Sequence, residues 1–344
     1  MARGKPAEMT LTTALQPVVT MVLDDMRSRL NSDEETTARW KADYEAARKA
    51  ERVGGSFGDW CEDLLLQAAV GWVLTTVFVR FIEDNELFGP AGTFISGQTL
   101  QRRSAARDRE QRFYAEHPHL NYLGYLEEVC EQLRAVPATS GLVDDHAAIG
   151  LYSPSDDAAR DLMDFWRQAD EDGTAVWGFH DPELDTRFLG DLYENLSSYA
   201  QEKYALRQTP EFVEEFILDR TLTPALAERS LEGFKLIDPT CGSGHFLIGA
   251  FQRLFDQWTE QEPGLNARER ARKAMSAIHG VDINPFAVAV TRFRLIVAFM
   301  KASQDERLDA GLTEPGFTVL AGDTLLYGLM ASGQEEIPLE AGVY

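Results

Sequence analysis

The stretch FKLIDPTCGSGHFLIGAFQRLF, residues 234–255, changes character three times. It opens with apolar residues that favour a short strand, passes an acid, a proline and two glycines, and takes up a helical pattern from about Gly244. A glycine-rich turn between a strand and a helix lets backbone approach a ligand closely, and the helix offers free N–H groups. The stretch therefore predicts a ligand-binding turn, although a Gly-x-Gly loop also serves simply to turn the chain.

The turn departs from two common phosphate-binding patterns. Only Gly242 and Gly244 of a G-x-G-x-x-G fingerprint are present, and no Gly-Lys-Ser/Thr follows. An acid, Asp238, stands at the end of the predicted strand beside the glycines. A carboxylate there suits a cationic ligand better than a diphosphate, because opposite charges attract.

Two more strands follow the same plan. Residues 276–283, SAIHGVDI, predict a second strand with a helix after it, and residues 316–323, GFTVLAGD, predict a third. Strands that alternate with helices indicate a parallel sheet with right-handed crossovers, and ligands of such sheets bind at the carboxyl ends of the strands. Asp238, Asp282 and Asp323 are all expected at strand ends. Each alone is also explained as a helix cap or a turn residue, but three in register favour one shared site.

The first part of the chain has a different pattern. Residues 1–190 are mostly amphipathic or charged helical segments, and Ser155 before Asp156 and Asp157 predicts a helix N-cap with an acidic first turn. We therefore expect a mainly helical domain over residues 1–190. An α/β domain, an incomplete Rossmann-like core of a parallel sheet with flanking helices, is expected over residues 191–344.

The longest apolar run covers residues 64–82 and is long enough to span a bilayer. Gln67 and Arg80 interrupt it, and acidic rather than basic residues flank it. A helix buried on all sides within the helical domain is the better interpretation, so no membrane association is expected.

Composition limits the function further. The 344 residues are 44% hydrophobic and 26% charged, which is ordinary for a globular chain. The formal charge is −23, from 33 basic and 56 acidic residues, so the chain as a whole repels nucleic acid. DNA contact would need a local basic patch or sequence outside this chain. Three separated cysteines and no signal-peptide pattern at the N-terminus fit a cytoplasmic location.

Four motifs together resemble the S-adenosylmethionine-dependent DNA methyltransferases that modify adenine N6. DPTCGSGHF, GVDINP and AGDTLL are similar to the first three motifs of that family, and QTPEFVEEFI is similar to the Thr-Pro motif that precedes them. They cover residues 208–326. Residues 187–226, RFLGDLYENLSSYAQEKYALRQTPEFVEEFILDRTLTPAL, more narrowly resemble the PglX methyltransferases of BREX phage-defence systems, especially the type 2 branch.

The resemblance implies a role for each motif in binding S-adenosylmethionine. The Thr-Pro pair is expected over the methionine end, the first motif at the amino and carboxylate groups, the second at the ribose and adenine ring, and the third at the adenine amino group. A sulfonium and an ammonium both favour an acidic pocket. The cofactor-binding residues implied in this way are Thr209, Pro210, Asp238, Thr240, Cys241, Gly242, Ser243, Gly244, Phe246, Asp282, Ile283, Asp323 and Thr324.

The catalytic motif of the family does not occur in this sequence. The family holds the flipped adenine with Asn/Asp/Ser-Pro-Pro-Tyr/Phe. The nearest match, Asn284-Pro285-Phe286, lacks the second proline and follows the second motif, where an ordinary turn is expected. No catalytic residue is therefore assigned. We expect the chain to be the N-terminal portion of a longer methyltransferase, without its target recognition domain and inactive alone.

Other chemistry is less well supported. The six histidines show no zinc-ligand spacing with the cysteines, so no metal site is expected. Cys241 precedes a predicted helix, which favours a lowered thiol pKa, although packing against the cofactor is the preferred role. None of the lysines has a glutamate two positions earlier, as a Glu-x-Lys nuclease site requires.

Two functions remain open. The first is the enzyme: an adenine N6-methyltransferase that marks host DNA as self. The second is a non-catalytic module that senses S-adenosylmethionine or docks other BREX proteins or a phage-encoded inhibitor. The second is favoured by the missing catalytic motif and by the charge of residues 1–200, which carry 19 basic and 35 acidic side chains and thus −16.

Overall fold

The computed structural model describes residues 10–50, 53–143, 147–171, 173–196, 209–308 and 316–324. Within these residues the chain is mostly helical, with one small parallel sheet, which confirms the predicted α/β class. Contacts divide the chain into two compact units. The first, the helical unit, comprises residues 1–85, 90–132 and 143–180, and the second, the sheet unit, comprises residues 86–89, 133–142 and 181–344. The predicted domain boundary at residue 190 stays a prediction.

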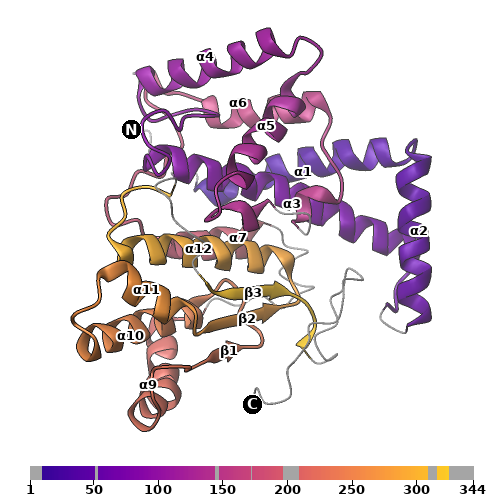
Figure 1. Ribbon diagram of the computed structural model, residues 1–344. Helices are drawn as coiled ribbons and strands as arrows, with labels where there is room; N and C mark the ends of the chain where they lie inside the picture. Colours follow the sequence, from indigo (N-terminus) through magenta and orange to yellow (C-terminus); the bar gives the residue numbers. More distant parts are fainter. Residues whose placement is uncertain are drawn as a thin grey trace, which may run out of the picture. The chain divides into compact units, whose positions relative to one another are not determined.

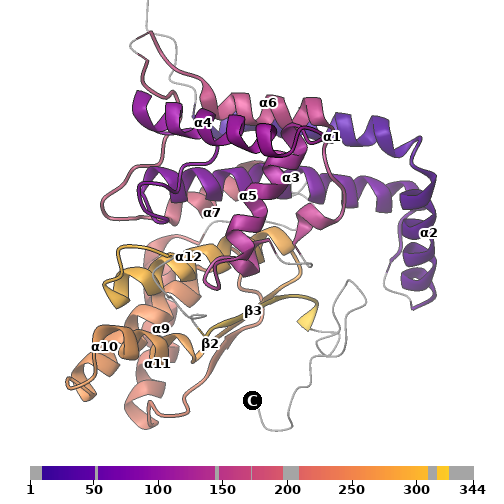
Figure 2. The same cartoon turned by 45° about the horizontal axis from the view of Figure 1, so that its top comes forward.

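The helical unit is built around one long helix, α3. Helices α1 and α6 pack on it, and α1 and α3 lie side by side (Figure 2), while α2 packs against both. The sequence of elements is α1 (Leu11–Leu30), α2 (Glu34–Lys49), α3 (Phe57–Asp84), α4 (Leu100–Glu116), α5 (Tyr122–Arg134), the short 3-10 helix η2 (Ala148–Gly150) and α6 (Asp156–Arg167). As predicted, Ser155 caps α6 and accepts a hydrogen bond from the Ala158 amide at 3.1 Å.

Helix α3 is a core helix of this unit. It begins with a capping box, in which Ser56 and Asp59 each accept from the other's backbone amide. By length and composition α3 passes for a membrane span, yet 89% of its most apolar window is buried inside the fold. At Gly71 a Cβ atom would lie 2.9 Å from Ala148, so η2 packs directly on the helix backbone. The apolar run therefore forms protein core, as the sequence predicts.

The sheet unit contains three parallel strands in the order β1-β2-β3 (Figure 1). Its elements are a 3-10 turn η1 (Ser140–Leu142), α7 (Arg187–Leu196), α9 (Glu211–Glu228), β1 (Leu236–Asp238), α10 (His245–Gln261), α11 (Ala267–Met275), β2 (Ile278–Asp282), α12 (Pro285–Ser303) and β3 (Thr318–Ala321). Asp238 pairs in register with Gly280, and Asp282 with Ala321. Because the strands are parallel, their carboxyl ends meet at one edge.

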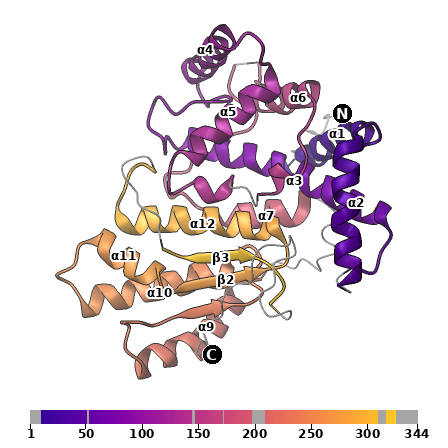
Figure 3. The ribbon, with the colours of Figure 1, turned by 45° about the vertical axis from the view of Figure 1, so that its right-hand side comes forward.

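Helices cover this sheet and pack on each other. Helix α12 packs on β2 and β3, α10 packs on β2, and both α9 and α11 pack on α10 (Figure 3). Asn284 caps α12 and accepts from the Phe286 amide at 3.0 Å, with Pro285 at the first helical position. One expectation is wrong in detail: β3 ends at Ala321, so Asp323 lies two residues beyond the strand instead of at its end.

Candidate functional site

Asp238 and Asp282 end the neighbouring strands β1 and β2. Both side chains are half-buried. The Thr240 amide donates to Asp238 Oδ1 at 3.1 Å, which closes a turn directly after β1. The two acids therefore stand at the same edge of the sheet, at the start of the loops where ligands of parallel sheets bind.

Asp282 connects the loops that follow all three strands. Its Oδ2 accepts from the Gly242 amide at 2.8 Å, and its Oδ1 accepts from the Asn284 amide at 2.8 Å. Its backbone carbonyl accepts from the Gly322 amide at 2.9 Å. One residue thus holds the glycine turn after β1, its own turn after β2 and the turn after β3 together.

The glycine turn needs its two glycines for different reasons. Gly242 has φ +52° and Gly244 has φ +84°, a backbone region that other residues adopt at a cost. At Gly244 a Cβ atom would lie 2.8 Å from Thr291, whereas nothing lies within 4 Å of the corresponding position at Gly242. Thr291 also donates to the Gly242 carbonyl at 2.7 Å. Gly244 is therefore required for packing and Gly242 faces open space.

The third motif lies beside the first. Thr324 Oγ1 donates to the Pro239 carbonyl at 3.1 Å, across the loops after β3 and β1. Asp323 and Thr324 are half-buried. The structure therefore brings residues of all three predicted strand-end motifs into one region, although Asp323 reaches it from a loop.

The two strand-end carboxylates are held in a partly dry environment. Burial raises the pKa of Asp282, against the backbone amides of Asn284 and Gly242 that stabilise its charge. Burial also raises the pKa of Asp238, and the negative charge of Asp282 raises it further. A positively charged ligand would relieve both effects, because it stabilises the ionised carboxylates.

The lowered pKa that a position before a helix favours for Cys241 does not occur. Burial raises the pKa of this thiol, and the charges of Asp282 and Asp238 raise it further. Only 4% of Cys241 is exposed, and its amide donates to the Val281 carbonyl at 2.9 Å. The residue is a buried, protonated packing group beside Gly280, where a Cβ atom would lie 3.2 Å from its sulfur.

The remaining predicted residues lie around this region. Pro210 precedes α9 as its N-cap residue, and the Thr209 carbonyl accepts from Arg187 at 3.2 Å. Phe246 is half-buried in the first turn of α10. Ile283 is 54% exposed, so its side chain offers apolar surface directly after Asp282. Cofactor contact by any of these residues stays a prediction.

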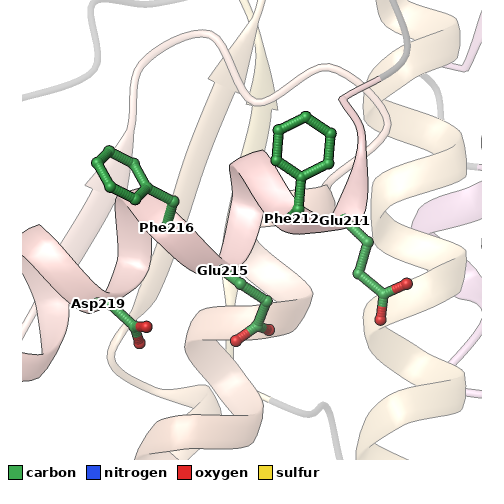
Figure 4. A pocket seen from close by; sticks show the side chains of 5 residues that line it. All are labelled: Glu211, Phe212, Glu215, Phe216 and Asp219. Atoms are coloured by element: carbon green, nitrogen blue, oxygen red, sulfur yellow. The ribbon is translucent and has the colours of Figure 1, made fainter.

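A pocket of about 730 Å³ lies along one face of α9. Figure 4 shows its five lining side chains, two phenyl rings and three carboxylates in a row on the helix: Glu211, Phe212, Glu215, Phe216 and Asp219. None of them belongs to the predicted cofactor set. The strand-end region carries the functional argument, because its hydrogen bonds converge there, whereas this pocket is an open groove on a single helix.

Sequence reasoning included Ser243 in the cofactor set but missed that it lies in a buried polar cluster with Glu214 and His245. Glu214, Ser243 and His245 are 7%, 4% and 4% exposed. Glu214 shares helical spacing with Leu218 and Leu222, which are buried, so that spacing was the signal that it faces the core. The burial of Ser243 and His245 has no comparable local signal.

The described residues fit S-adenosylmethionine on three observations. Two half-buried carboxylates favour a cationic ligand, the space at Gly242 is open, and Ile283 offers apolar surface next to Asp282. These features match a ligand that combines positive charge with a flat apolar ring.

Comparison with known families defines the class. Residues 219–317 match the model of the MmeI DNA-methyltransferase domain. This stretch includes β1, the glycine turn and β2, so the sheet unit contains a DNA-methyltransferase-type domain, a class that transfers a methyl group from a donor.

Two curated relatives narrow this class. The chain is 44% identical over 325 residues to the adenine-specific methyltransferase PglX of Streptomyces coelicolor, a match that covers 92% of this chain and 27% of that protein. It is 23% identical over 201 residues to a putative type II restriction enzyme and methyltransferase of Methanocaldococcus jannaschii, covering 43% of this chain and 17% of the relative. The predicted resemblance to PglX is confirmed, and it includes the helical unit. The type 2 branch stays a prediction.

Proposed function

We propose that this chain carries the cofactor-binding part of an S-adenosylmethionine-dependent DNA adenine N6-methyltransferase. The parent protein marks host DNA as self in a cytoplasmic BREX phage-defence system. The observation that carries the proposal is Asp282, whose carboxylate and carbonyl join the turns after β1, β2 and β3 beside an open glycine turn. Similarity to PglX over 92% of the chain supports the substrate and the system.

In this proposal the residues of the chain bind and orient the cofactor. Bound S-adenosylmethionine supplies an electrophilic methyl group on its sulfonium. Asp282 accepts from the ribose hydroxyls, Ile283 packs against the adenine ring, and Asp323 with Thr324 meets the adenine amino group. Asp238, Thr240 and the turn from Cys241 to Gly244 bind the amino and carboxylate groups, and Thr209, Pro210 and Phe246 pack around the methionine end. Catalysis then rests on positioning the two reacting atoms in a site without water.

DNA is held mainly outside this chain. The 344 residues contain no Asn/Asp/Ser-Pro-Pro-Tyr/Phe tetrapeptide and carry a charge of −23. The match spans 27% of PglX and 17% of the second relative. We therefore propose that the adenine-binding motif and most phosphate contacts come from the rest of the longer protein.

Calorimetric titration with S-adenosylhomocysteine tests the cofactor site. Asp282→Ala is expected to weaken binding about 100-fold, because it removes the ribose acceptor and the bond that holds Gly242. Asp256→Ala is the matched control, since Asp256 is exposed on α10 and accepts only a surface bond from Gln252 among the described contacts. Equal affinity of the wild type and Asp282→Ala contradicts the proposed site. Absence of N6-methyladenine from host DNA with the parent protein and all its partners present contradicts the activity.

A non-catalytic docking module is the second candidate. The observation that favours it is the exposed face of α9, where Phe212 and Phe216 are 75% and 59% exposed beside three carboxylates. Solvent-exposed aromatic rings of this size are frequent in protein interfaces. Under this reading Phe212→Ala with Phe216→Ala abolishes recruitment of defence proteins and leaves DNA methylation by the parent intact. If the double variant loses DNA methylation but still recruits defence proteins, the enzyme is favoured.

A further inference from the structure

Two arginines, Arg187 and Arg294, join the buried polar cluster next to the glycine turn, so that four helices of the sheet unit contribute side chains to it. Arg187 comes from α7, Glu214 from α9, His245 from α10 and Arg294 from α12. Glu214 Oε2 lies 3.6 Å from Arg187 and 4.0 Å from His245 Nδ1. Arg294 donates to the Ser243 carbonyl in the glycine turn itself. The cluster is therefore in direct contact with the proposed cofactor turn.

Glu214, His245 and Arg294 are buried, but several of the polar atoms in the cluster have no hydrogen-bond partner. Among the residues that the structure describes, neither ring nitrogen of His245 has a hydrogen-bond partner, and neither does Glu214 Oε2. A buried polar atom without a partner costs about 1–3 kcal/mol. Three such atoms at one place lower stability, which points to a role for this cluster beyond packing.

Arg187 links this cluster to the Thr-Pro segment. Its second guanidinium nitrogen donates to the Thr209 carbonyl at 3.2 Å, while the first faces Glu214. Glu214 stands one helical turn after Pro210, and its amide donates to the Pro210 carbonyl at 3.2 Å. Arg187 thus holds Thr209 and Glu214 holds Pro210, and the two side chains face each other as an ion pair.

The same cluster limits how close α7 comes to the glycine turn. At Gly190 a Cβ atom would lie 2.9 Å from Ser243 Oγ and 3.4 Å from His245 Nε2. Helix α7 therefore approaches the turn by its bare backbone. Its residue Arg187, one turn earlier, is placed between Thr209 and Glu214 by this close approach.

We propose that Arg187, Glu214 and His245 are positioning residues that hold the Thr209–Pro210 segment against the glycine turn for binding of the methionine end of S-adenosylmethionine. This inference rests on the proposed function. Arg187 aligns Thr209, Glu214 aligns Arg187, and His245 packs between Glu214 and the turn at the start of α10.

The same calorimetric titration with S-adenosylhomocysteine tests this positioning role. Glu214→Gln keeps the shape and removes the charge that orients Arg187, so binding is expected to weaken about tenfold, which equals about 1.4 kcal/mol. Arg187→Met is expected to lose a similar factor, and the double variant no more than either alone, because both changes break one ion pair. Glu215→Gln is the matched control. Its carboxylate is exposed and pairs with Arg253 at 2.8 Å, so binding changes less than about twofold.

The outcomes separate this inference from the proposed function. Wild-type affinity in Glu214→Gln, or losses that simply add in the double variant, overturns the positioning role while the cofactor site stands. A wild-type chain that binds no S-adenosylhomocysteine overturns both. If Glu214→Gln unfolds, the comparison of Arg187→Lys with Arg187→Met takes its place. The Arg187 side chain is 32% exposed and therefore tolerates substitution better than the buried Glu214. Lys, which keeps the charge, is then expected within about threefold of wild type and Met about tenfold weaker; equal affinities of Met and wild type overturn the inference.

Discussion

Each unit of this protein buries a cluster of charged side chains, and the two clusters are completed to different degrees. In the helical unit, Arg80 and Glu83 are fully buried and Asp84 is 5% exposed. Arg80 donates to Glu83 at 2.6 Å and to both oxygens of Asp84 at 2.8 Å. In the sheet unit, Glu214 lies 3.6 Å from Arg187, and its Oε2 has no hydrogen bond from any described residue.

Backbone donors account for the rest of the difference. Glu83 also accepts from the amides of Phe94 and Ile95, and Asp84 accepts from the Phe179 amide at 3.0 Å. The cluster in the helical unit thereby fastens two loops to the end of α3. The cluster in the sheet unit borders the glycine turn and leaves acceptors unused. In the helical unit every carboxylate of the cluster is held by Arg80 and by backbone amides, which serves the fold, whereas the less fully bonded cluster beside a predicted ligand site serves binding.

The largest expected effect comes from breaking the network around Arg80, the more fully bonded of the two. Arg80→Met leaves Glu83 and Asp84 buried without their cation, and the pKa of each is already raised by burial. Removing one partner of a buried ion pair costs about 3–5 kcal/mol. Urea denaturation of the wild type and the variant measures this loss as a fall in the unfolding free energy.

An exposed ion pair on the same unit provides the control. Arg27 pairs with Glu62 at 2.8 Å, and both side chains are more than two fifths exposed, at 44% and 49%. Arg27→Met is expected to cost less than about 1 kcal/mol. If the two variants lose equal stability, completeness of the buried network is not what stabilises the helical unit.

The helical unit also shows which features a sequence can predict. The buried character of residues 64–82 and the Ser155 cap depend on neighbours within a few positions, and both predictions are confirmed. Arg80 was read only as an interruption of an apolar run. Its partners at i+3 and i+4 follow from helical spacing. The amides that bond those carboxylates come from residues 11 to 95 positions away, which no local pattern reveals.

In the sheet unit the same limit applies. The strands, the glycine turn and the two strand-end acids Asp238 and Asp282 follow from local pattern. The bond from Gly242 to Asp282 spans 40 positions and depends on strand order. The position of Cys241 before a helix is a local feature that favours a lowered pKa. Burial and the charges of Asp282 and Asp238, which raise the pKa instead, are set by the tertiary fold.

Alanine substitution of the two glycines in the turn gives the next largest effect. It compares Gly244, which packs against α12, with Gly242, which faces open space. Gly244→Ala meets both an unfavourable φ and a Cβ contact of 2.8 Å with Thr291, so we expect a loss of about 2–4 kcal/mol. Gly242→Ala meets only the unfavourable φ, so it should cost about 1 kcal/mol. Denaturation of both variants measures the difference. Equal losses would show that backbone conformation alone, and not contact with α12, determines the requirement for glycine.

The effect that is smallest at neutral pH concerns His245, and it grows as the pH falls. Burial, together with the positive charges of Arg294 and Arg187, lowers its pKa from 6.5 to about 3. Below pH 6.5 the unfolded chain binds a proton at this residue and the folded chain does not, so its contribution to stability is present above pH 6.5 and is lost as pH falls toward 3. The loss is at most about 1.4 kcal/mol for each pH unit.

Removing His245 isolates this effect from the carboxylates that face the same region. The raised pKa values of Glu214, Asp238 and Asp282 act in the opposite sense, since they favour the folded chain at low pH and disfavour it as pH rises through them. These contributions are shared by the wild type and His245→Gln, so they largely cancel in the difference between the two. We expect the stability of the wild type relative to the variant to fall steadily from pH 7 to pH 4. A difference that instead grows as the pH falls means that His245 is protonated in the fold and pairs with Glu214, and a difference that does not change means that folding leaves its pKa unshifted. Either result contradicts the lowered pKa.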